Sequence, residues 1–517
     1  MVLEVRRRSL ERTSLLLSEV VAVSHEVAAT SSRLAKRDLV AGSLRAAGPG
    51  QARAVAAYLS GVTPQGRVGV GWRTLASLPE PAAEASLTVT DVDAALSALA
   101  GEGGRSAKGA IVADLFGRAT ATEQDWLRAL ILGQVRQGAL DGVLLAAVAL
   151  AADVPEAAVR RAAMLAGRTY DVVEPALVGG EAALAQITLE VGRVVRPMLA
   201  GSAPDVASAM AAHDGPVAVE AKLDGIRVQV HKSGDDVRVF TRGLDDITAR
   251  LPEVVELARA LPMQSAVLDG EAIALRPDGR PRPFQETGAR TASSRSVEAL
   301  RAATPLTTYL FDLLARDDEV LLDRPFAERA EALREVVPSG SLIPGVLTAD
   351  PTAAQAFFDE LVAGGHEGVV IKDPAAPYAA GARGRGWTKV KPRHTFDLVV
   401  LAVEWGSGRR RGKLSNIHLG ARGEDGELVM LGKTFKGMTD EMLAWQTQRF
   451  LELETHRDDW TVHLRPEQVV EVAVDGVQTS RRYPAGIALR FARVLRYRDD
   501  KSAADADTVD SVRALLG

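Results

Sequence analysis

Hydrophobic and polar positions follow different periods in different parts of the chain. Up to about residue 195, apolar residues recur three and four positions apart, as in 127–133 and 157–165, which predicts helices. Repeated Pro and Gly interrupt this pattern between residues 61 and 84, where we expect loops. From residue 196 to about 394, alternation with a period of two predicts antiparallel strands, for example at 226–230 and 237–240.

Helices and strands both occur in this second stretch, and a third stretch follows. Helical patterns at 326–337 and 352–363 make residues 196–394 an α+β domain. Residues 395–517 carry short apolar strands separated by Gly-rich turns, which is typical of a small barrel such as the OB-fold. The pattern therefore predicts a multidomain chain, with an all-α domain at 1–195, an α+β core at 196–394 and an all-β OB-fold at 395–517.

Composition narrows the class of protein. The 517 residues are 47% hydrophobic and 25% charged, as in soluble globular proteins of several domains. Cysteine is absent, which excludes disulfides and Cys-ligated zinc. A net charge of −5 gives no overall nucleic-acid signature, so any DNA contact needs local basic patches. The longest apolar run, 142–152, is too short for a bilayer, and we expect a cytoplasmic protein without membrane contact.

Lys222 is the strongest candidate for a reactive group. It ends the strand-rich run 217–222 and precedes an Asp224-Gly225 turn and Arg227. A lysine in this position can attack a phosphorus atom and hold a nucleotide covalently, and a nearby cation would favour its free amine. The alternative is an ordinary hairpin from residue 222 to residue 240 with solvated cations.

Five further motifs follow Lys222 in order. They are Thr241-Arg242-Gly243, Leu268-Asp269-Gly270-Glu271, Tyr309-Leu310-Phe311-Asp312, Glu367-Gly368-Val369-Val370-Ile371-Lys372 and Trp387-Thr388-Lys389-Val390-Lys391. The series resembles the covalent nucleotidyltransferases, which include ATP-dependent DNA ligases, RNA ligases and mRNA-capping enzymes. The resemblance covers about residues 196–505 and is greatest to the three-domain ATP-dependent DNA ligases of bacteria and archaea. It implies an adenylyltransferase core with ATP-grasp-like antiparallel sheets.

The resemblance also implies a role for each motif residue. Lys222 would form the covalent lysine–AMP intermediate, Glu220 would read the adenine amino group, and Phe311 would lie against the adenine face. Glu271 would bind the ribose or a metal ion, and Glu367 would be a second acidic ligand of Mg²⁺. We expect Asp269-Gly270 to form a turn that places Glu271 at the start of a strand. Cations expected at the ribose and phosphates are Arg227, Arg242, Lys372, Arg383, Lys389 and Lys391, the lysines forming a ring around the triphosphate.

Basic residues near both ends are candidates for phosphate contacts. Residues 489–501 resemble the last motif of the ligases, in which Arg490, Arg493, Arg498 and Lys501 would orient the leaving pyrophosphate, and Lys433 would contact DNA. In the helical domain, expected to bind DNA, the candidates for backbone phosphates are Arg33, Lys36, Arg37 and Arg45, although solvated helix faces have the same pattern. A structural or dimerising module is the alternative for that domain.

The resemblance implies a complete activity. The protein would seal nicks in duplex DNA with ATP and Mg²⁺, as a monomer, in replication, repair or recombination. Three alternatives stay open at this point: an RNA ligase, a capping-type nucleotidyltransferase that uses GTP, and a non-catalytic protein that binds nicks or ends.

Overall fold

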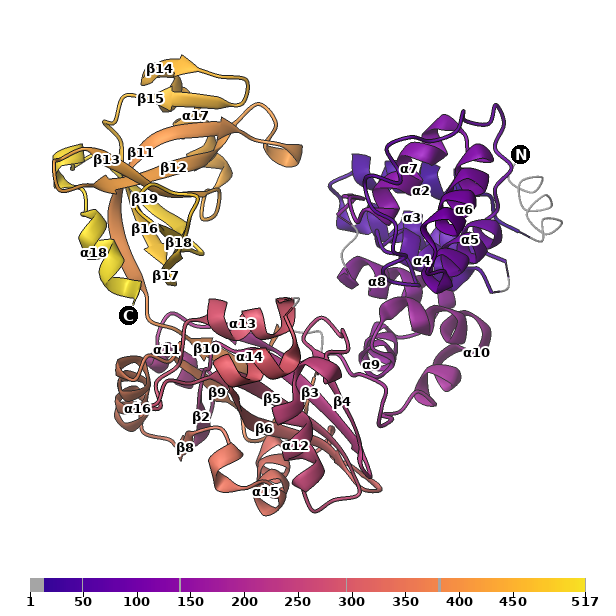
Figure 1. The fold of residues 1–517 in the computed structure, drawn as a ribbon, viewed down its shortest axis with the longest axis horizontal. Coiled ribbons are helices and arrows are strands. Elements are labelled where there is room, and N and C mark those ends of the chain that lie inside the picture. Colours follow the sequence, from indigo (N-terminus) through magenta and orange to yellow (C-terminus); the bar gives the residue numbers. More distant parts are fainter. Residues whose placement is uncertain (1–13, 49, 139–140, 294, 380–382, 517) are drawn as a thin grey trace.

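Three regions are visible in the computed structural model of the chain (Figure 1). The structure describes residues 14–48, 50–138, 141–293, 295–379 and 383–516, without the side chains of 383–385 and 409. We name the parts the helical region (residues 14–185), the central region (199–390) and the C-terminal region (394–516). Their helical, mixed and β-rich architectures confirm the predicted fold class.

The helical region buries its apolar stripes in one core that includes Leu17, Val55 and Trp126. Polar residues set the helix starts: the Thr88 hydroxyl accepts from the backbone of Asp91, and the Asp91 carboxylate accepts from the backbone of Thr88. Its helices are α2 Leu17–Ala29, α3 Arg33–Ala46, α4 Ala52–Tyr58, α5 Val89–Gly101, α6 Arg105–Gly117, α7 Ala121–Ile131, α8 Asp141–Ala152, α9 Glu156–Ala166 and α10 Val173–Ala185.

The helical region is joined to the central region by apolar packing. Met164 and Leu165 of α9 share a buried cluster with Met198, Leu314 and Tyr378, which lie beyond the predicted boundary. Gly179 and Gly180 lie near the end of the helical region but inside α10, where Gly180 kinks the helix with a φ of 58°.

Two five-stranded sheets form the central region. One has the order β1-β10-β9-β2-β8 and the other the order β4-β3-β5-β6-β7, and only the β1–β10 pair is parallel. The strands are β1 Leu199–Ser202, β2 Val217–Ala221, β3 Ile226–Ser233, β4 Asp236–Thr241, β5 Ser265–Ala274, β6 Leu306–Arg316, β7 Glu319–Val320, β8 Gly345–Thr348, β9 Val369–Lys372 and β10 Arg383–Val390. The helices are α11 Val206–Met210, α12 Pro252–Ala260, α13 Phe284–Ala292, α14 Val297–Ala303, α15 Phe326–Val336 and α16 Pro351–Ala363, of which α15 and α16 were predicted.

Asp269 and Gly270 do not form the predicted turn. Both lie inside β5, where the pairing with β6 shifts register between them. A Cβ at Gly270 would lie 2.7 Å from the carbonyl oxygen of Tyr309, so this close approach of the two strands requires glycine. The Asp-Gly pair thus marks a bulge in a central strand rather than a chain reversal, and Glu271 lies in mid-strand.

The C-terminal region is built on β-sheet, as predicted. Strands β13-β12-β11-β15-β14 form one path, and β16 pairs with both β11 and β19. The bounds are β11 His394–Trp405, β12 Leu414–Arg422, β13 Leu428–Thr434, β14 Glu454–Arg457, β15 Thr461–Leu464, β16 Val469–Val474, β17 Gly476–Thr479, β18 Ile487–Arg490 and β19 Arg493–Arg498. Two helices that we had not expected, α17 Asp440–Glu452 and α18 Val509–Arg513, contribute Phe450 and Val512 to the core.

None of the helices in the described ranges has the length and apolar character needed to cross a membrane.

Candidate active site

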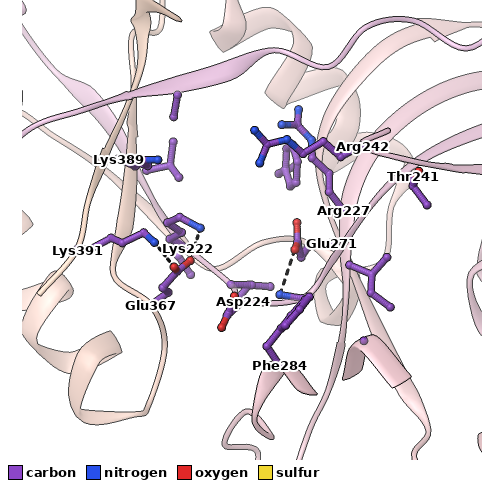
Figure 2. Close-up of a pocket in the computed structure, with 18 of the residues that line it drawn as sticks. Lys222, Asp224, Arg227, Thr241, Arg242, Glu271, Phe284, Glu367, Lys389 and Lys391 are labelled. Atoms are coloured by element: carbon purple, nitrogen blue, oxygen red, sulfur yellow. Dashed lines mark hydrogen bonds and ion pairs between the residues drawn. The ribbon is translucent and has the colours of Figure 1, made fainter. Parts of the chain in front are cut away.

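A pocket of about 1110 Å³ contains most of the predicted site residues. Its walls come from the two central sheets, from the turn that follows β2 and from the tip of the C-terminal region at Arg490 and Phe491. Figure 2 shows Lys222, Glu367, Lys389 and Lys391 on one side of the pocket, with Arg227, Arg242 and Glu271 facing them. Motifs that are distant in sequence therefore meet around a single cavity.

Lys222 and Glu367 are paired through both backbone and side chains. Lys222 lies just after β2, where its N–H donates to Gly368 (2.8 Å) and its carbonyl accepts from Glu367 (3.1 Å). The Glu367 carboxylate forms ion pairs with Lys222 through one oxygen and with Lys391 through the other. Burial alone would raise the pKa of Glu367, but the two ammonium groups hold this pKa below its ordinary value.

The cation beside Lys222 is Lys391. Lys391 is one of the cations expected around the nucleotide, and it shares the Glu367 carboxylate with Lys222. Lys391 also contacts Asp475 of the C-terminal region at 3.1 Å. Burial lowers the pKa of Lys391, but Glu367 and Asp475 outweigh it, so its pKa is raised and it stays charged. Lys222 thus shares one carboxylate with a permanent cation.

Glu271 is held by the turn that follows Lys222. Its Oε1 accepts from the backbone N–H of Gly225 at 3.1 Å. A Cβ at Gly225 would lie 2.5 Å from the carbonyl oxygen of Ala272, so a side chain there would separate the two segments. Burial raises the pKa of Glu271 to about 7 although the charges of Lys222 and Arg227 oppose this shift. Glu271 can therefore exist in either protonation state near neutral pH.

Arg227 is fixed by a buried network that the sequence did not predict. It donates to both oxygens of Asp269 (3.0 and 2.6 Å) and to the carbonyl of Met198 (2.7 Å). The Tyr378 hydroxyl donates to Asp269 at 2.7 Å and accepts from the backbone N–H of Met198 at 2.9 Å. This network attaches the segment after the helical region to the pocket wall. Asp269 lay within a quoted motif, whereas no pattern marked Tyr378.

Aromatic side chains line a further part of the pocket, which we call its aromatic end. Phe311 of β6 and Trp387 of β10 meet edge to face, with ring centroids 5.8 Å apart. Lys372, expected in the ring around the triphosphate, instead lies buried among aromatic rings and forms an ion pair with Glu220 at 2.5 Å. This places Lys372 with the two residues expected to bind the base.

For three other predicted residues the structure gives a position in the pocket or in a strand. Arg242 lines the pocket just after β4 and is exposed, and Lys389 lines it from β10 (Figure 2). Arg383 begins β10, but its side chain lies outside the described parts of the structure. All three stay candidates for contacts with the nucleotide.

The basic residues of the last motif are separated in the structure. Arg490 lines the pocket and donates to Asp224 at 3.0 Å. Arg498 and Lys501 instead form ion pairs with Asp397 inside the C-terminal region, and the pocket does not include Arg493. Of the four residues, only Arg490 can reach a ligand in this arrangement.

Several basic residues predicted to contact DNA already have partners within the protein. Lys433 forms an ion pair with Glu404 of β11. Lys36 is only 8% exposed and donates to the carbonyl of Gln137. Arg37 pairs with Asp38 at 2.7 Å, and Arg45 donates to carbonyls at the end of α8. Lys36 in particular has a structural role.

No group of three or more His, Cys, Asp and Glu side chains that could hold a metal ion occurs in the described parts of the chain. Glu271 and Glu367 nevertheless both line the pocket.

Family models match most of the chain. The model described as ATP dependent DNA ligase domain covers residues 197–391, the one described as ATP dependent DNA ligase C terminal region covers 410–501, and the one described as DNA ligase N terminus covers 70–149. A "Probable DNA ligase" of Beutenbergia cavernae is 59% identical, over 97% of this chain and 100% of its own length. One from Nocardioides sp. is also 59% identical, over 98% and 99%.

The fold also matches solved structures. The one named "Pmar-Lig_Pre." covers 93% of this chain and 99% of its own, with a TM-score of 0.59 and 20% identity. The related "Pmar-Lig_PreS3" has a TM-score of 0.58 at the same coverage. At this identity the likeness concerns the fold alone.

Proposed function

This chain belongs to the ATP-dependent DNA ligase family, and we propose that Lys222 carries AMP during its reaction. The protein is a DNA ligase that depends on ATP. The RNA ligase, capping and non-catalytic alternatives that the sequence left open are thereby decided against.

Adenylation of Lys222 needs its neutral amine. Nζ forms a bond to the α-phosphorus of ATP, the bond from that phosphorus to the bridging oxygen breaks, and pyrophosphate leaves. AMP then passes to the 5′-phosphate at a nick, and the 3′-hydroxyl displaces it. The supporting observation is that Lys222 enters the pocket paired with Glu367, whose second oxygen holds Lys391. The ion pair must open and a proton must leave Nζ before attack.

The remaining site residues divide between base, ribose and phosphates. Glu220 and Phe311 lie at the aromatic end and would bind adenine. Glu271, Arg227 and Arg242 face Lys222 across the pocket and would bind the ribose and the α-phosphate (Figure 2). Lys389 and Lys391 would neutralise phosphate oxygens, and Arg383 is a further candidate for this role. Lys372 would instead act at the aromatic end of the pocket, where the base binds.

The donor set of the pocket suits Mg²⁺. Mg²⁺ is usually bound through one or two carboxylates together with substrate phosphates, so a larger protein cluster is not needed. Glu367 lies beside Lys222 and Glu271 faces it across the pocket, and these two carboxylates would hold the ion. When bound, Mg²⁺ neutralises charge that develops on the phosphates.

Nicked duplex DNA is the proposed partner, and a cytoplasmic monomer is the proposed state. We assign DNA binding to residues 1–195, adenylyl transfer to 196–394 and an OB-fold that closes over the pocket to 395–517. The contacts of Arg490 with Asp224 and of Asp475 with Lys391 support this closure.

Intact-mass analysis tests the assignment of Lys222. After incubation with ATP and Mg²⁺, the wild-type protein should gain the mass of one AMP, and Lys222→Ala should gain none. Lys232→Met is the matched control, because Lys232 is a buried lysine of β3 whose Nζ donates to the carbonyl of Arg259, away from the pocket. An adduct that persists in Lys222→Ala would place the nucleophile elsewhere.

A further inference from the structure

Lys372 has an environment that contact with a triphosphate does not explain. Its side chain is 2% exposed, and its Nζ lies 4.8, 4.4 and 4.5 Å from the ring centroids of Phe311, Phe326 and Trp387. Such a cage of aromatic faces stabilises a cation that has lost its water. The ammonium is therefore held at the base end of the pocket.

The same ammonium holds two groups assigned to the base. Nζ forms an ion pair with Glu220 Oε2 at 2.5 Å and donates to the carbonyl oxygen of Phe311 at 3.1 Å. Glu220 is the proposed reader of the adenine edge, and Phe311 is the proposed contact of its face. One buried cation thus fixes both groups relative to each other.

We propose that Lys372 is a positioning residue for base selection, which keeps Glu220 an ionised acceptor aimed at the 6-position of the purine. The inference rests on the proposed function, because it takes the pocket as the site for ATP. It concerns which nucleotide is chosen rather than how AMP is transferred.

Glu220 has one oxygen left for a ligand. Oε2 is occupied by Lys372, whereas Oε1 has no hydrogen-bond partner among the described residues, and the side chain is 12% exposed to the pocket. The neighbouring strand also confines it, since a Cβ at Gly345 would lie 3.0 Å from Glu220 Cγ. An ionised oxygen in this place accepts from the 6-amino group of adenine and repels the 6-oxygen of hypoxanthine or guanine.

Charge explains why the lysine is needed. Burial keeps the pKa of Glu220 above its ordinary value, and Lys372, which forms the ion pair with it, opposes this rise more than any other neighbour. The other charged groups that act on Glu220 are Asp312, which raises its pKa, and Arg334, which lowers it. Without Lys372, the buried carboxyl would take up a proton and become a donor. A donor at this point would favour a 6-oxygen over a 6-amino group.

Single-turnover formation of the Lys222–AMP or Lys222–IMP adduct tests the inference. ATP and inosine triphosphate differ in the 6-substituent and in the proton on N1. In Lys372→Met, we expect the half-saturating ATP concentration to rise by about 10- to 100-fold, because a hydrogen bond to a charged group is lost. The value for inosine triphosphate should change less than about threefold, and the rate at saturation should change little for either nucleotide. Lys372→Arg should retain most of the preference for ATP.

Two further variants make the result specific. Lys232→Met removes another buried lysine of the central region and should leave the ATP to inosine triphosphate ratio unchanged. In a Glu220→Gln background, Lys372→Met should change that ratio less than about threefold, because Lys372 acts through the carboxylate. The double variant also removes both charges, so it folds without an unpaired buried ion.

The outcomes separate the inference from the proposed function. An equal rise for both nucleotides in Lys372→Met, or an unchanged ratio, would overturn the inference while the wild-type adduct at Lys222 stands. If the wild-type protein formed no adduct at Lys222, the proposed function and this inference would both fall.

Discussion

Asp224 accepts a hydrogen bond from Arg490 at 3.0 Å although 266 residues separate them in the chain. Asp224 lies two residues after Lys222, and Arg490 ends strand β18 of the C-terminal region. The contact places a guanidinium at the mouth of the pocket, next to the proposed nucleophile. The C-terminal region thus takes part in the site in this arrangement.

Loss of Arg490 should impair adenylation more than sealing. Arg490→Ala removes the closing contact and a cation near the leaving pyrophosphate, so we expect self-adenylation to fall by about 10- to 100-fold. Sealing of a nick that already carries AMP should fall much less, because no pyrophosphate leaves in that step. Both rates are measured by single turnover on matched nicked duplexes. Equal loss in the two assays would contradict a role limited to adenylation.

Tyr378→Phe should weaken the network around Arg227. The substitution leaves the N–H of Met198 without a partner and removes one donor from Asp269, so we expect a loss of about 1–3 kcal/mol in the free energy of unfolding. Self-adenylation should fall as well, because Arg227 loses its orientation. Tyr497→Phe is the control, since it also removes a donating hydroxyl, which bonds to Gln446 at 2.7 Å, but in the C-terminal region. A loss of stability without any loss of adenylation in Tyr378→Phe would limit the network to folding.

Glu271 should make the stability of the free protein depend on pH. Its pKa is raised from an ordinary value of 4.5 to about 7. Between these values the unfolded chain releases the proton and the folded protein keeps it, so stability falls as the pH rises through this range. The free energy of unfolding of the wild-type protein should fall between pH 5 and pH 8, and we expect this fall to be about 1–3 kcal/mol smaller in Glu271→Gln. Urea denaturation of both proteins at each pH measures the difference. Parallel curves would show that Glu271 is ionised in the folded protein throughout.

The loop between α4 and α5 offers cations for DNA. Arg67 and Arg73 are exposed there, as is Trp72 (62% exposed), and neither arginine forms an ion pair with another described residue. We expect each alanine substitution to lower the salt slope of nick binding by about one unit. Arg128→Ala is the control, because Arg128 already pairs with Asp125 at 2.6 Å. An unchanged slope in the double variant Arg67→Ala/Arg73→Ala would exclude this loop from the DNA contact.

Short motifs allowed much of the pocket to be predicted. Lys222, Glu271 and Lys391 line one cavity because their motifs end or interrupt neighbouring strands, where period-two patterns already indicated sheet. The alternation also predicted the hairpin of β3 and β4. These features depend on local sequence, which the chain displays directly.

Other features depend on pairings that the sequence does not show. Asp269-Gly270 has the composition of a turn, and only the register shift against β6 places it in mid-strand. Lys372 and Lys36 look like exposed cations until the fold surrounds them with aromatic rings or a carbonyl oxygen. A charged side chain is read as solvated by default, so its burial emerges only from packing between distant segments.

The two joints of the central region should behave differently when the protein is heated or strained. The interface at α9 is apolar, because Met164 and Leu165 would each expose apolar surface if the helical region detached. At the other joint no apolar cluster of the described residues spans the two sides, which meet through the polar contacts of Arg490, Asp475 and Thr479. Water replaces such contacts at little cost, whereas it cannot replace the buried cluster. The helical and central regions should therefore unfold as one cooperative unit. The C-terminal region should move away from the pocket and back at temperatures below that transition, without unfolding.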